Sequence, residues 1–227
     1  MHLTRKKKQL AAGALLLSSA GLIGGTAGLS AHAAGGGATP SLGGTDTKAT
    51  LHSLNNSGAT GISTVTVNGR KIDVSVDAKR LLKGMPHAMH IHFGAQARHE
   101  CPTVRDDSNA DHRLNTVEGL PAYGPVKVSL TKHGDTSPKS TLAVNRFPTA
   151  PEHQIHYDRN IGIGKKLAHA IANGKAVVVI HGIDYNHNGK YDFSAGKSDL
   201  DPSLPAEATD PAACGVLHES NGSLPTQ

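Results

Sequence analysis

The stretch that decides the fold is 62-ISTVTVNGRKIDVSV-76. Apolar and polar residues alternate through 62–67 and again through 72–76, and this period of two is that of a half-buried β-strand. Asn68-Gly69 lies between the two runs, and this dipeptide favours the tight turn of a β-hairpin. The stretch therefore predicts two antiparallel strands joined by a short turn.

Outside the hairpin, short segments of strand composition alternate with long polar connections. Trp is absent and Phe and Tyr number only 3 and 4, so the core must rest on Val, Ile, Leu and Ala. This pattern favours an all-β fold, an antiparallel sandwich or barrel with long loops. One short helix is expected within 161–173, around 165–171. Further strands are expected at 88–93, 126–130, 141–144, 154–157 and 176–181.

The N-terminal segment has the layout of a secretory signal peptide. Basic residues at 5–8 precede an apolar run from 10 to about 23, and Ala31-His32-Ala33 forms an A-x-A cleavage site. A transmembrane anchor is the alternative, but the run is short and interrupted by glycines. We expect cleavage near Ala33 and a secreted protein, extracellular or in the cell envelope, without a membrane anchor. The expected parts are the signal peptide at 1–33, a disordered leader at 34–48, one β domain at 49–218 and a tail at 219–227.

The charge of the chain gives no indication of a nucleic-acid partner. Four of the 23 basic residues and none of the 18 acidic residues lie in the signal segment, which leaves a net charge of +1 on the mature chain. The chain also lacks a basic stripe with interleaved aromatic residues, so we expect no nucleic-acid binding.

The chain has two cysteines, Cys101 and Cys214. An even number of cysteines in an exported protein favours a disulfide bond, because exported compartments are oxidising. Two free buried thiols are the alternative.

Three histidines suggest a metal site. His90 and His92 alternate with apolar residues in an expected strand, so their side chains would project to one face with Cα atoms about 6.5–7 Å apart. His181 ends the apolar run 176–180, where a buried strand would deliver a third imidazole at its edge. Three imidazoles suit copper. A single histidine would more often be a surface residue or a satisfied core residue.

These histidines and cysteines occur in an order that resembles the copper/zinc superoxide dismutase family. That family carries His-x-x-His-x-His, a glycine shortly after it and a disulfide cysteine nine residues past the last histidine. It also has a later strand of the form Val-Val-His and closes with Ala-Cys-Gly-Val. The resemblance covers about 51–217. The matching residues are His87, His90, His92, Gly94 and Cys101, then His181, then Ala213-Cys214-Gly215-Val216.

The resemblance implies a Greek-key β-sandwich or barrel with a Cys101–Cys214 disulfide. It implies that His90, His92 and His181 bind copper and that His87 is a structural histidine beneath the site. It also implies a small anion, superoxide, as the substrate. Copper would alternate between Cu(II) and Cu(I), oxidising one superoxide to oxygen and reducing the next to peroxide.

The chain departs from this family in two places. The zinc-binding histidines and aspartate have no counterpart between Cys101 and Val126, where His112 is the only histidine, so zinc is not expected. The family also has an arginine three residues before its last cysteine, which attracts superoxide. Pro211 takes that position here, and its lack of charge removes an electrostatic guide for a small anion.

Two loops match the spacing of calcium-binding EF-hand loops, which supply hard oxygen ligands at alternate positions. In the first loop His112 replaces the usual glycine at position 6, and in the second, which has Gly189 there, position 12 is Ala195 and carries no carboxylate. A solvated, turn-rich segment is the alternative for both, because Asp and Asn favour turns. The expected ligands are Asp107, Asn109, Asp111, Arg113 (through its carbonyl) and Glu118 in the first loop, and Asp184, Asn186 and Asn188 in the second.

The sequence therefore predicts a secreted metal-binding protein that resembles copper/zinc superoxide dismutase. A copper-dependent dismutase without zinc is the first hypothesis for its activity. A non-catalytic copper-binding module and a calcium-stabilised extracellular structural domain are the alternatives. The sequence leaves the oligomeric state open.

Overall fold

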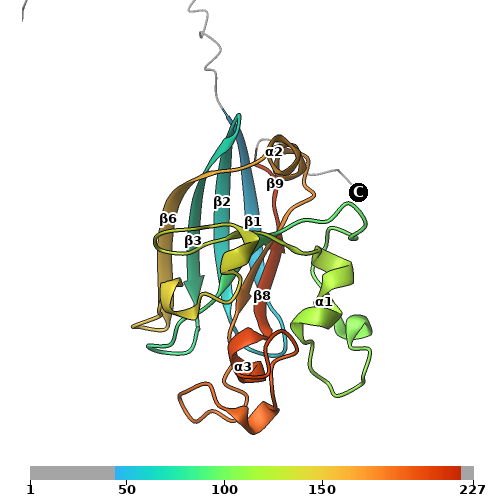
Figure 1. Ribbon diagram of the computed structural model, residues 1–227, viewed down its shortest axis with the longest axis vertical. Helices are drawn as coiled ribbons and strands as arrows, with labels where there is room; N and C mark the ends of the chain where they lie inside the picture. The colour runs from blue at the N-terminus through green and yellow to red at the C-terminus, as the bar shows by residue number, and fades with distance from the viewer. Residues whose placement is uncertain (1–43, 221–227) are drawn as a thin grey trace, which may run out of the picture. The chain divides into compact units, whose positions relative to one another are not determined.

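The described part of the chain is an antiparallel β-structure, as the sequence predicts. A computed structural model describes residues 44–220 (Figure 1), and the expected signal peptide, most of the leader and most of the tail lie outside these residues. Eight strands follow one another in a curled sheet in the order β5-β4-β7-β8-β1-β2-β3-β6, and β9 pairs with β1. The strands are β1 (Thr45–Ser53), β2 (Thr60–Asn68), β3 (Lys71–Lys79), β4 (Met89–His92), β5 (Val126–Ser129), β6 (Gln154–Gly162), β7 (Val177–His181), β8 (Pro211–Val216) and β9 (His218–Glu219).

The predicted hairpin is confirmed as β2 and β3, which pair from Thr60↔Lys79 to Asn68↔Lys71. Gly69 has a φ of +61°, which a glycine adopts without steric cost. The alternation also sets burial, because Val65 and Val67 of β2 and Ile72, Val74 and Val76 of β3 all lie in the core.

The curled sheet has two halves, one formed by β1, β2, β3 and β6 and the other by β4, β5, β7 and β8. Strand β1 joins the halves because it pairs with strands of both. Its first residues, through Leu51, pair with β2, whereas His52 and Ser53 pair with β8. The chain crosses between the halves after β3, β5 and β6, and such long connections are typical of a Greek key. Beyond the edge strand β5, the backbone carbonyl of Thr131 accepts hydrogen bonds from Tyr157 and Arg159 of β6, at 3.2 and 2.5 Å. These bonds join the two edges of the sheet.

Three short α-helices lie in the connections: α1 (Thr116–Tyr123), α2 (Lys165–Ala172) and α3 (Ala206–Thr209). Of these, α2 confirms the helix expected around 165–171. No helix within 44–220 has the length and hydropathy needed to cross a membrane. Four 3₁₀ turns complete the elements: Val104–Asp106, Pro138–Ser140, Val144–Arg146 and Phe193–Ala195.

Two expectations about element boundaries are wrong. The strand expected at 141–144 is instead part of a local turn, because Ala143 N–H donates to the Ser140 carbonyl at 3.1 Å and Arg146 N–H to the Ala143 carbonyl at 2.8 Å. The domain expected at 49–218 extends further at both ends, because β9 ends at Glu219 and β1 begins at Thr45. Thr47 is buried there and its hydroxyl donates to the Val65 carbonyl at 2.9 Å.

The predicted disulfide is confirmed between Cys101 and Cys214, which are 113 residues apart in sequence. Cys214 lies in β8, and Cys101 lies in the long connection between β4 and β5 that also contains α1. The bond therefore fixes this connection to the sheet.

Candidate metal centre

The three predicted histidines come from two neighbouring strands and share one face of the sheet. In the pairing of β4 with β7, His90 lies opposite Val179 and His92 opposite Val177. Residues opposite each other point to the same side, and so do alternate residues of one strand. His181, two residues after Val179, therefore joins His90 and His92 on this face.

This face is the outer side of the barrel, and the connection containing α1 covers it. The inward residues of the same strands, Met89, Ile91, Val178 and Ile180, belong to the main core. On the outer side, Val177, Val179 and Cys214 form a second cluster with Tyr123 of α1. The Tyr123 ring lies 4.4 Å from the His92 ring, centroid to centroid. The disulfide-linked connection thus shields the histidines from solvent.

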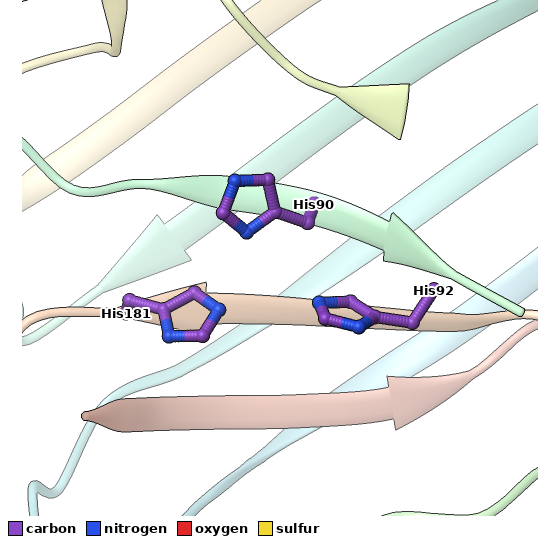
Figure 2. Close-up of side chains that lie close together, drawn as sticks. All are labelled: His90, His92 and His181. Carbon is purple, nitrogen blue, oxygen red and sulfur yellow. The ribbon is translucent and has the colours of Figure 1, made fainter. Parts of the chain in front are cut away.

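The three imidazoles lie close together (Figure 2) and are buried. Ring centroids are 5.1 Å apart for His90–His181, 5.7 Å for His90–His92 and 6.2 Å for His92–His181. Exposed fractions are 2% for His90, 0% for His92 and 2% for His181. One ligand nitrogen of each ring lies within 4.8 Å of the other two, and no other such group of three or more His, Cys, Asp or Glu occurs within 44–220.

Each ring uses one nitrogen to bind a backbone carbonyl. The partners are the Thr141 carbonyl for His90 Nε2 at 3.2 Å, the Gly124 carbonyl for His92 Nδ1 at 2.7 Å and the Thr209 carbonyl for His181 Nδ1 at 2.6 Å. Because a carbonyl only accepts, these nitrogens must carry the hydrogen. The other nitrogen of each ring then has a free lone pair.

Those free nitrogens are buried and have no hydrogen-bond partner: they are His90 Nδ1, His92 Nε2 and His181 Nε2. A buried polar atom without a partner costs about 1–3 kcal/mol, so native structures contain few of them. Three at one place, all with lone pairs, form an arrangement that a metal ion would satisfy.

Burial also keeps these rings neutral. Desolvation, and after it the proximity of His181, lower the pKa of His92 to about 3, and desolvation lowers the pKa of His181 to about 4. The pKa of His90 lies well below its usual value, mainly because of burial and then because of His181 and His92. Near neutral pH all three rings can therefore bind a metal without first losing a proton.

A small cavity of about 20 Å³ lies against His90 and His181. This volume holds about one water molecule. Its walls include Val126, Leu142 and Leu200, and no lysine or arginine lines it within the described residues. Pro211 is buried at the start of β8.

His87 lies beneath the cluster rather than within it. Its Nδ1 is 2.9 Å from the His181 carbonyl and its Nε2 is 3.3 Å from the Leu82 carbonyl. The Tyr191 hydroxyl lies 3.2 Å from His87 Nδ1. Desolvation lowers the pKa of His87, so the ring is neutral. The contact with the His181 carbonyl holds the backbone of His181. The structural role of His87 stays a prediction.

Replacing Gly182 with alanine is expected to lower the free energy of unfolding by at least about 2 kcal/mol, through backbone strain and overpacking. Gly182 has a φ of +110°, and an added Cβ would overlap the Tyr191 hydroxyl and lie 2.9 Å from His87 Nδ1. Urea denaturation would measure the change. Gly196→Ala is the matched control, because Gly196 has a φ of +90° but open space around it. Equal losses in the two variants would contradict the packing argument.

The first calcium-like loop is arranged by hydrogen bonds to its own backbone. Asp107 Oδ2 accepts from His112 N–H at 2.9 Å, and Asn109 Oδ1 accepts from Asp111 N–H at 2.8 Å. Asp111 Oδ1 accepts from the N–H of Arg113, also at 2.9 Å. His112 has a φ of +65°, the conformation for which glycine is usual at this position.

The carboxylate of Glu118 is already engaged with backbone N–H groups. Its Oε1 accepts from Ser108 N–H at 3.0 Å and Asn109 N–H at 3.2 Å, and its Oε2 accepts from Asn115 N–H at 3.1 Å. The carboxylates of this loop do not come together as the three histidines do. Calcium binding at Asp107–Glu118 stays a prediction.

The second calcium-like loop has the same internal pattern. Asp184 Oδ2 accepts from Gly189 N–H at 2.8 Å, and Asn186 Oδ1 accepts from Asn188 N–H at 3.1 Å. Glu207 of α3 was not predicted from the sequence to belong to this loop. It is fully buried, and its carboxylate accepts from Tyr185 N–H at 3.1 Å and from Asp192 N–H at 2.7 Å. A glutamate on a short helix thus accepts hydrogen bonds from the backbone of each loop: Glu118 in the first and Glu207 in the second. Glu207 lies outside the calcium-loop spacing, so that pattern could not identify it. Calcium binding here also stays a prediction.

His112 does not join the cluster of His90, His92 and His181. It lines a separate cleft with Arg113 and Asp184. The histidine cluster therefore contains no bridging histidine from the connection after Cys101.

No family model matches the chain, and no curated protein matches it. The resemblance to copper/zinc superoxide dismutases therefore rests on the sequence motifs alone. The structure supports a coarser conclusion: the described residues form a disulfide-linked β-barrel with a three-histidine cluster that could bind a metal ion.

Proposed function

We propose that this protein binds one copper ion through His90, His92 and His181. The observation that carries the proposal is the convergence of three buried nitrogens that have lone pairs and no partner. Imidazole nitrogens suit copper, and Cu²⁺ has the highest affinity of the divalent first-row metals for such ligands. The family resemblance supports copper at the same three positions.

The proposed activity is that of a zinc-lacking superoxide dismutase. Bound copper would supply one-electron exchange with superoxide. The protein would hold the three rings as neutral ligands through the carbonyls of Thr141, Gly124 and Thr209 and would keep bulk water from them. The cavity beside His90 and His181 is large enough only for a very small molecule.

A non-catalytic copper-binding module is the second candidate, and the walls of that cavity favour it. They are mainly apolar and contain no lysine or arginine, and Pro211 supplies no charge. Without a nearby cation, the capture of a small anion loses the electrostatic attraction that raises its rate of encounter.

Metal analysis of purified mature protein tests copper binding. We expect one copper per chain after loading and nitrogen hyperfine coupling in the electron paramagnetic resonance spectrum of the Cu(II) form. His181→Gln should lower copper affinity at least about tenfold, because it removes one of three ligand nitrogens. His52→Gln is the matched control, because His52 is exposed on β1.

Copper retention by His181→Gln with wild-type affinity would contradict the assignment. Binding of calcium alone would favour the extracellular structural domain instead. A dismutase assay on the copper-loaded protein then separates the two copper hypotheses. Fast turnover that His181→Gln abolishes supports the enzyme, whereas bound copper without turnover supports the module.

A further inference from the structure

A second site lies apart from the three histidines. It is a cleft of about 380 Å³, and none of His90, His92 and His181 lines it. Five segments that are distant in sequence meet there: the β1–β2 turn, the residues after β3, both calcium-like loops and the turn before β6. Clefts of about 300–1,000 Å³ are typical of small-molecule sites.

Unusual backbone conformations are concentrated in this cleft. Eight residues other than glycine have a positive φ within 44–220, and six of them line the cleft. This conformation costs about 1 kcal/mol or more per residue, least for Asn and His, and tends to cluster at ligand-binding sites. The six residues are Asn55, Asn56, Arg80, His112, His153 and His187.

The cleft has a positively charged group without an acidic partner. The guanidinium of Arg80 donates to the Gly58 carbonyl at 2.5 Å and to Thr60 Oγ1 at 3.0 Å, and both acceptors are neutral. Within the described residues Arg80 forms no salt bridge. By contrast, Arg113, the other arginine of the cleft, is paired with Asp111 at 2.9 Å.

Three imidazoles in the lining of the cleft add hydrogen-bonding capacity to it. His153 Nδ1 donates to the Leu81 carbonyl at 2.9 Å, which leaves its Nε2 free. Among residues 44–220, the rings of His112 and His187 have no hydrogen-bond partner. The only carboxylate in the lining belongs to Asp184, and its two oxygens accept from Asn188 N–H at 3.1 Å and Gly189 N–H at 2.8 Å.

We propose that this cleft binds a small molecule carrying phosphate or carboxylate groups, with Arg80 as its charged anchor. A guanidinium fork matches the oxygens of either group. His153, His112 and His187 would hydrogen-bond the remaining oxygens of the ligand. The site shares no side chain with the metal centre, so each of the two proposals can fail without the other.

The test is a titration of the full mature chain at constant ionic strength, monitored by ¹H–¹⁵N nuclear magnetic resonance. Inorganic phosphate and citrate are the two probes, and chloride is the reference salt. We expect saturable shifts of the amide signals of Asn56, Arg80 and His187 with at least one probe. Phosphate alone or citrate alone would identify the preferred oxyanion. Absence of saturable shifts with both probes would overturn the proposal.

Arg80→Asn should weaken binding about tenfold, because it removes a charge-assisted hydrogen bond, while asparagine tolerates the positive φ of this position. Lys79→Gln is the matched control: it removes one positive charge from the adjacent residue, which is exposed and does not line the cleft. His187→Asn is a second variant at an exposed position and should weaken binding severalfold. An equal loss in Lys79→Gln and Arg80→Asn, or no loss in both cleft variants, would overturn the proposal.

Discussion

Replacing Cys101 and Cys214 together with alanine is expected to lower the free energy of unfolding by about 4–5 kcal/mol. The bond closes a loop across 113 residues, so its removal frees a large part of the chain in the unfolded state. The value follows from chain entropy for such a loop and is an upper figure. Urea denaturation of the oxidised wild type and of the variant would measure the difference.

The disulfide is also expected to affect metal binding. Cys214 packs with Tyr123, Val177 and Val179, and the Tyr123 ring lies against His92. Without the bond, the connection that covers the histidines is held only by noncovalent contacts. We expect faster metal loss to a chelator in the double variant. Wild type treated with a reductant is the control for the substitutions. If the double variant and the reduced wild type both kept the unfolding midpoint of the oxidised wild type, the expected loss of stability would be contradicted.

The metal-free protein is expected to lose at least about 1 kcal/mol of unfolding free energy between pH 6.5 and pH 5. In the folded state the pKa values of His92 and His181 are about 3 and about 4, and that of His90 is well below its usual 6.5. In the unfolded chain these histidines bind protons as the pH falls through about 6.5, whereas the folded chain does not. His92 and His181 therefore each contribute stability above pH 6.5 and lose about 1.7 kcal/mol of it by pH 5, and His90 changes in the same direction.

The titration of Asp210 changes the unfolding free energy in the opposite direction to that of the histidines. Its side chain is 3% exposed, and burial raises its pKa to about 7 even though Tyr185 donates a hydrogen bond to it. A raised carboxyl pKa gives stability that is present at low pH and is lost as the pH rises through the folded pKa. Between pH 6.5 and pH 5 Asp210 regains about 2 kcal/mol, which partly offsets the loss of about 3.3 kcal/mol from His92 and His181. Burial lowers the pKa values of His90 and His87 as well, so these two rings add to the loss.

Chemical denaturation of metal-free protein at several pH values would check this prediction. Asp210→Asn should steepen the loss of stability on acidification, because it removes the opposing group. The His92→Gln/His181→Gln variant should flatten the profile. A metal-free wild type with the same stability at pH 6.5 and pH 5 would contradict the prediction.

Much of the strand structure could be predicted from local sequence. The hairpin of β2 and β3 followed from alternation and from Asn68-Gly69, and the positions of β4 and β7 followed from apolar runs that end in histidine. The strand expected at 141–144 failed because the N–H groups of Thr141 and Ala143 bond to carbonyls three residues earlier, as in a turn. The composition of 141–144 could not predict this turn, since side chains outside the segment hold it. The hydroxyl of Ser140, which precedes the segment, donates to Asp135 and accepts from Arg146.

The sequence by itself determined that His90 and His92 share a face, because the two-residue period of a strand depends only on neighbouring residues. It also limited any disulfide within the chain to Cys101–Cys214, since the chain has two cysteines, but the bond itself is shown by the structure. Only the tertiary structure decided which nitrogen of each ring is free. The carbonyls that fix the rings lie 51, 32 and 28 residues away from His90, His92 and His181, so folding of the whole barrel was needed to bring them together.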